Sequence, residues 1–115
     1  MDAKLLDLRG CRHVVIPGGI EKVGKRWFWR SEIESVEIPT SAREIGADAF
    51  FKCKCLKSVV FAEDSKLEKI GAGCFSKTGI EKITVPKNVT EIKEGAFYQC
   101  RKLKEIVFEI GRAHV

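Results

Sequence analysis

The chain has 115 residues, of which 44% are hydrophobic and 32% are charged, and its formal net charge is +5. These fractions are those of a soluble globular protein. No apolar run approaches the roughly 18 residues of a membrane-spanning helix, and Asp7 and Arg9 interrupt the amino terminus where a secretion signal has its apolar core. We therefore expect no membrane insertion.

Residues 1–10 precede any recurring pattern, and we interpret them as an amino-terminal flank or partial cap. A short phrase then recurs, with intervals of 22, 23, 24 and 23 residues between its copies. Such intervals are typical of solenoid repeats, in which each unit is too small to bury its own apolar face and must stack on its neighbours. Positions that are equivalent in successive units together form a slot. The units begin near Cys11, Ile33, Leu56, Ile80 and Leu103.

Two segments alternate inside each unit. The first is a period-two apolar run, such as Val36 and Ile38, which predicts a short strand with one buried face. The second runs from a bend such as Ile45-Gly46 to a phenylalanine such as Phe50, which we expect to fill the layer between the two sides of the coil. The sequence therefore predicts a β-rich solenoid of about four and a half coils over residues 11–110, with little or no regular helix. Residues 111–115 are interpreted as a carboxy-terminal tail within a truncated repeat.

The run Ile-x-x-Val-x-Ile-Pro, followed by Glu-Ile-Gly and by Ala-Phe-x-x-Cys-x-x-Leu, occurs at 33–56. It recurs at 80–103 with isoleucine and valine exchanged at 83 and 85 and with Lys93 in place of the glycine. It resembles the BspA-type leucine-rich repeat, and the resemblance covers about residues 11–110. What the resemblance implies is a curved solenoid that binds proteins. It also implies placement at the surface of a host-associated microbe, where some relatives engage extracellular matrix proteins of the host. The first unit departs from the pattern with Trp27-Phe28-Trp29.

The charges alternate in sign from unit to unit. The residue after each repeat start is in turn Arg12, Glu34, Lys57, Glu81 and Lys104. If the coils stack at the inter-strand distance of about 4.8 Å, these residues form ladders of opposite charge that fix the register. A phosphate-binding stripe needs one sign along the array, so we expect no nucleic-acid partner. A weaker alternative is polyanion binding through Lys52, Lys54, Lys57, Arg101, Lys102 and Lys104.

Neither the cysteines nor the histidines indicate chemistry. Cys53 and Cys100 are two units apart, roughly 9 to 10 Å in a stack, whereas a disulfide needs Cα atoms within about 7 Å. The cysteine spacing does not match a zinc site, and Cys55 is interpreted as an inert surface thiol rather than a redox group. His13 and His114 fall at opposite ends of the array, and no catalytic motif is present. We predict no enzymatic activity, cofactor or metal.

The candidate site is the row of strand side chains that point away from the core, which lines the concave face in leucine-rich repeats. The row is predicted to contain His13, Val15, Ser35, Glu37, Ser58, Val60, Lys82, Thr84, Glu105 and Val107. A second candidate is the aromatic row Trp29, Phe51 and Tyr98, which lateral stacking between coils explains as well. Two functions remain open: a protein-interaction or adhesion scaffold, and a structural spacer within a longer array whose neighbouring repeats are its only partners.

Overall fold

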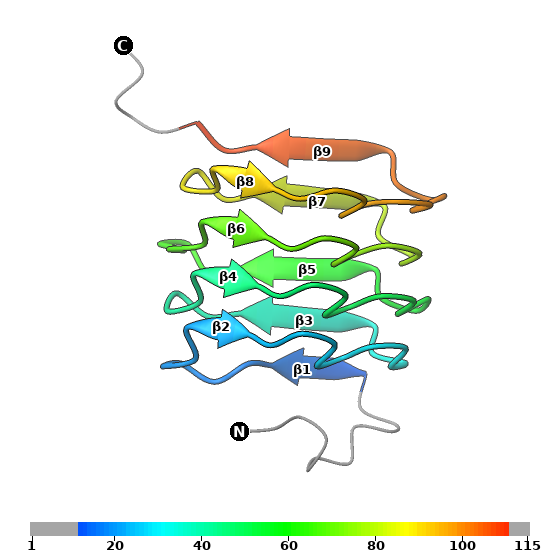
Figure 1. Cartoon of the computed structure of the whole chain (residues 1–115), viewed down its shortest axis with the longest axis horizontal. Coiled ribbons are helices and arrows are strands. Elements are labelled where there is room, and N and C mark those ends of the chain that lie inside the picture. The colour runs from blue at the N-terminus through cyan, green and yellow to red at the C-terminus, as the bar shows by residue number, and fades with distance from the viewer. Residues whose placement is uncertain (1–11, 111–115) are drawn as a thin grey trace.

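The computed structural model of the chain describes residues 12–110, and in this range it contains short strands joined by turns, without a helix. The predictions for the amino-terminal flank, Cys11, His114 and the carboxy-terminal tail lie outside the described residues. For the rest of the chain, the predicted β-rich solenoid is confirmed (Figure 1).

The strands form two layers that run in opposite directions (Figure 1). Each coil contributes one strand to each layer, and the chain crosses between the layers through turns. The long-strand layer consists of β1 (His13–Val15), β3 (Ser35–Ile38), β5 (Ser58–Phe61), β7 (Lys82–Val85) and β9 (Glu105–Phe108). The short-strand layer consists of β2 (Lys22–Val23), β4 (Glu44–Ile45), β6 (Lys69–Ile70) and β8 (Glu91–Ile92).

All strand pairs in the described range are parallel, and their register follows the repeat. In the long-strand layer His13 is the Cα partner of Ser35, which in turn pairs with Ser58. The short-strand layer is one sheet in the order β2-β4-β6-β8. The long-strand layer is divided, since β1-β3-β5 and β7-β9 form separate hydrogen-bonded sheets, with β5 and β7 side by side (Figure 1). This layer is therefore not the continuous sheet that simple repetition suggests.

One apolar core lies between the two layers. In β3 the side chains of Val36 and Ile38 are buried while that of Glu37 is exposed, as the period-two pattern predicts. The phenylalanines of the second segment stack along the solenoid axis, with ring centroids 5.2, 5.3 and 5.7 Å apart from one coil to the next. The expectation that these rings fill the space between the layers is confirmed. The rings belong to Phe28, Phe50, Phe75 and Phe97.

Among the described residues, the predicted charge ladders form side-chain ion pairs at some of their steps. Arg12 Nη1 lies 3.1 Å from Glu34 Oε2, and the Lys57 backbone N–H donates a hydrogen bond of 2.9 Å to the Glu34 carbonyl. Lys22 Nζ lies 3.3 Å from Glu44 Oε2, in a slot whose next member is Lys69. These pairs are largely exposed, so each contributes about 0 to 1 kcal/mol and its main effect is on register.

The cysteine slots also behave as predicted. Cys53 and Cys100 are free thiols, and each donates a hydrogen bond of 2.9 Å to the carbonyl oxygen of a core phenylalanine, Phe28 or Phe75. Cys74 is fully buried in the slot that alanine fills in neighbouring coils. These thiols act as small groups that complete the packing of the turns.

Candidate functional site

The outward side chains of the long strands form an exposed row, which we call the strand face. Ser35 and Val107 are half-buried, and the other predicted members are exposed. Parallel register brings equivalent members side by side, so Val15, Glu37 and Val60 are Cα partners in succession. The members of the strand face are His13, Val15, Ser35, Glu37, Ser58, Val60, Lys82, Thr84, Glu105 and Val107.

Polar contacts hold the two ends of the strand face in different ways. His13 Nε2 lies 2.6 Å from Glu37 Oε2, and the other ring nitrogen contacts the Ser35 hydroxyl. At the opposite end Lys82 Nζ lies 3.7 Å from Glu105 Oε1. Glu37 is therefore oriented by a neighbouring coil before any ligand arrives.

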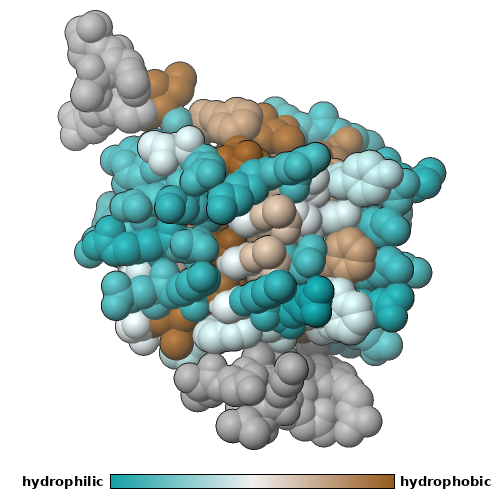
Figure 2. Space-filling model, in the orientation of Figure 1, coloured by the Kyte–Doolittle hydropathy of each residue, from teal (hydrophilic) through white to brown (hydrophobic). Residues whose placement is uncertain are grey.

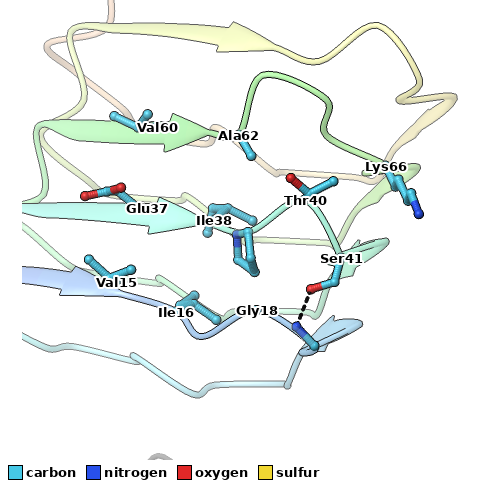
Figure 3. Close-up of a pocket in the computed structure, with 12 residues that line it drawn as sticks. Val15, Ile16, Gly18, Glu37, Ile38, Thr40, Ser41, Val60, Ala62 and Lys66 are labelled. Carbon is cyan, nitrogen blue, oxygen red and sulfur yellow. Dashed lines mark hydrogen bonds between the residues drawn. The ribbon is translucent and has the colours of Figure 1, made fainter.

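An open hollow of about 580 Å³ lies where β1, β3 and β5 end (Figure 3). The exposed side chains of Val15 and Val60, 60% and 50% exposed, flank Glu37 on the two adjacent strands. Beyond the strands, the Gly19 N–H donates a 3.0 Å hydrogen bond to Ser41 Oγ, and Lys66 lies at the far side. The hollow thus combines two exposed valines with one carboxylate and one ammonium group.

Sequence reasoning missed the turn residues of this hollow. The predicted strand face contains strand positions alone, whereas the chain after each strand supplies two thirds of the lining. The available signal was proline after two of the strands, at Pro17 and Pro39, which marks where the chain leaves the layer. The missed residues are Gly18, Gly19, Thr40, Ser41, Ala62 and Lys66.

The hollow is open and mixes apolar and charged side chains, which suits the binding of a protein segment. Within residues 12–110, no three His, Cys, Asp or Glu side chains gather in a way that could hold a metal ion. The hollow is shallow and open, and its one carboxylate, Glu37, already pairs with His13. No helix of the described range is long and apolar enough to cross a membrane. Such a surface can receive alternating side chains of an extended protein segment.

The predicted aromatic row is only partly assembled. Trp29 and Tyr98 are 46% and 60% exposed, whereas Phe51 is half-buried. Ser76 interrupts the row, because it is buried and donates a 3.0 Å hydrogen bond to the Tyr98 carbonyl. Cations cover two of these aromatics: Arg30 lies 5.0 Å from the centroid of Trp29, and Lys52 lies 5.6 Å from that of Phe51.

The opposite face, formed by the short strands, is mostly hydrophilic (Figure 2). Apolar side chains are more exposed toward β9, where Phe108 is 58% exposed. In the short-strand layer Ile92 is 39% exposed, although Val23, Ile45 and Ile70 of the same slot are fully buried. The short-strand face therefore offers less of the apolar and polar mixture seen on the strand face.

Residues 8–111 match the family described as a BspA type leucine rich repeat region, with six copies of the repeat. The chain belongs to the BspA-type leucine-rich repeat family. The match spans nearly the whole sequence, so the predicted family is confirmed. Comparison with curated proteins finds no significant match.

Solved structures share this fold. The pneumococcal vaccine antigen PcpA is similar over 85% of this chain and 30% of its own, with a TM-score of 0.74 and 28% identity. A leucine-rich repeat protein from Bacteroides capillosus has a TM-score of 0.74 and 24% identity, covering 89% of this chain and 80% of its own. A leucine rich cell surface protein from Faecalibacterium prausnitzii has a TM-score of 0.61 and 24% identity, covering 85% and 36%. The chain thus spans about a third of the pneumococcal antigen.

Proposed function

We propose that this BspA-type solenoid is a non-catalytic protein-interaction scaffold that binds its partner on the strand face. The observation that carries the proposal is the hollow in which Val15 and Val60 flank Glu37. Exposed apolar side chains beside an oriented carboxylate provide both contact area and a specific polar contact. The family is generally one of protein-binding repeats, which supports the same conclusion.

The partner that we propose is an extended segment of an extracellular protein, with host extracellular matrix proteins as the first candidates. This choice rests on family likeness, as does placement at a cell surface. The segment would present a basic side chain to Glu37 and apolar side chains to Val15 and Val60. Because the strand side chains alternate, a bound extended segment would be read at every second residue.

A binding assay against a panel of immobilised matrix proteins tests this proposal. The double variant Glu37→Lys with Val60→Asp is expected to weaken binding at least about tenfold, since it removes one polar and one apolar contact at the centre of the surface. Glu91→Lys, which makes the same acid-to-base change in the short-strand layer, is the control and should bind as the wild type does. Equal affinity of the double variant and the wild type would place the binding site elsewhere.

A structural spacer is the alternative function, and the share of the pneumococcal antigen that this chain spans, 30%, favours considering it. A spacer positions other repeats and has no ligand of its own. The two functions predict different results for this chain alone. A scaffold binds the partner without further repeats, whereas with a spacer only the longer array binds it. Comparing this chain with the longer array in the same assay separates them.

A further inference from the structure

We infer that the chain has a second interaction surface, a basic edge that binds an acidic segment of a protein. The basic edge lies apart from the strand face, where each coil turns from the short-strand layer into the next long strand, at the right of Figure 1. It is independent of the function proposed above. Its members are Arg30, Lys52, Lys54, Lys77, Arg101 and Lys102.

A ladder of like charge forms the centre of the basic edge. Arg30, Lys52 and Lys77 occupy one slot in successive coils, with left-handed φ values of 60°, 58° and 60°. Gln99 holds the same slot in the next coil, with φ of 54°. Backbone hydrogen bonds of 2.8 to 2.9 Å connect these turns from coil to coil, for example from the Arg30 N–H to the Phe51 carbonyl. The ladders beside the strands alternate in sign, whereas this ladder does not.

The like charges act on one another. Arg30, then Lys77, and more weakly Lys54, lower the pKa of Lys52. Like charges in adjacent positions destabilise a stack of strands. Among the described residues, none of the six cations of the basic edge lies within 4.0 Å of a carboxylate that would offset this repulsion. Arg12, Lys22 and Arg43 of the alternating ladders do have such partners. A feature that opposes stability is better explained by binding than by folding.

Two adjoining hollows lie along the ladder and could receive the side chains of a ligand. One, of about 370 Å³, is lined by five of the cations and by no acidic side chain. The other, of about 350 Å³, is lined by Arg30, Lys52, Lys54 and one acid, Glu32. Lys52 and Lys54 line both hollows, so the two form one basic depression that spans several coils.

The surroundings favour an acidic protein segment over a nucleic acid. Lys52 and Lys77 lie 5.6 and 5.8 Å from the centroid of Phe51, and Arg30 covers Trp29, so these rings are not free platforms for base stacking. The ladder of cations ends at Gln99, which limits the length of polyanion that it can follow. Trp, Tyr and Arg are enriched at protein interfaces, and exposed Trp29 and Tyr98 adjoin the cations.

The test uses a fluorescein-labelled peptide of eight glutamates and measures its anisotropy with the full chain at low and physiological salt. The double variant Lys52→Gln with Lys77→Gln should fold normally, because Gln99 already occupies this slot. The double variant removes two ion pairs between these lysines and glutamates of the peptide, which should weaken peptide binding by about 2- to 30-fold. Lys66→Gln with Lys87→Gln makes the same change in net charge outside the basic edge and should leave the affinity unchanged.

Three results would overturn the inference. The first is no binding of the glutamate peptide at low salt. The second is equal weakening by both double variants, which would indicate attraction by net charge alone. The third is tighter, Lys52-dependent binding of oligo-dT or dextran sulfate of matched charge, which would assign the edge to a nucleic acid or a sulfated glycan. Glu37→Lys with Val60→Asp should leave peptide binding unchanged, so failure here is separable from failure at the strand face.

Discussion

Cys74 lies in a slot that alanine fills in the adjacent coils, at Ala49 and Ala96, and its side chain has no exposed surface. Burial raises the pKa of the Cys74 thiol well above 9.0, and burial also raises the pKa of Cys53. The folded state thus keeps these thiols protonated to a higher pH than the unfolded chain does. Their contribution to stability is complete below pH 9 and is lost as the pH rises through the folded pKa.

Substitution of Cys74 by alanine tests this linkage. The wild-type melting temperature is expected to fall as the pH rises above about 9, and Cys74→Ala should reduce that fall, because it removes the group with the larger pKa shift. Thermal melts at pH 7, 9 and 10 provide the comparison. Cys55→Ala removes an exposed thiol and should keep the wild-type profile. If the melting temperature of Cys74→Ala falls with pH as steeply as that of the wild type, other groups dominate the loss of stability at alkaline pH.

Gly71 shows how closely the coils approach each other at the bend after β6. A Cβ at this position would lie 2.7 Å from the Ala47 nitrogen and from the Ile45 carbonyl oxygen, which are backbone atoms. Gly71→Ala is therefore expected to destabilise the fold by about 1 to 3 kcal/mol in urea unfolding. Gly18→Ala is the control, since its Cβ would meet nothing within 4 Å. Similar stabilities for the two variants would contradict the close approach.

At the scale of the element, the stacked phenylalanines connect each coil to the next. Phe50 and Phe75 are fully buried, and each stacks on a ring above and a ring below. Phe50→Ala should lower the free energy of unfolding by about 3 to 5 kcal/mol, because the cavity opens between two coils. Phe51→Ala, which truncates the half-buried neighbour, should lower it by less. Chemical denaturation of both variants measures the difference, and equal losses would disprove the special role of the stack.

Most of these elements could be predicted from the sequence because the repeat supplies the long-range information that single strands lack. Phe28, Phe50 and Phe75 recur at the same place in the repeat, which is enough to assign them to one slot. The break between β5 and β7 was not predictable, since both strands fit the apolar pattern equally well. Hydrogen bonding between neighbouring strands depends on backbone position, which apolar spacing does not specify.

At the scale of the whole molecule, the sequence predicted the row of exposed strand side chains but not the hollow at its end. The row follows from alternation, whereas the hollow depends on where Ser41 and Lys66 of the turns lie. The basic edge was predicted only in part. Lys52, Lys54, Arg101 and Lys102 belong to the polyanion-binding set that the sequence offered as a weaker alternative. Arg30 and Lys77 were missing from that set, although they and Lys52 are spaced like the phenylalanines that precede them.

Both proposed surfaces depend on coils that stack in phase, and NMR of the chain with labelled phenylalanines tests this directly. The account predicts nuclear Overhauser contacts between the rings of Phe28 and Phe50, of Phe50 and Phe75, and of Phe75 and Phe97, whose centroids are 5.2 to 5.7 Å apart. It predicts no contact between Phe28 and Phe97. Absence of the Phe50–Phe75 contact, or a direct contact between Phe28 and Phe97, would contradict the stack.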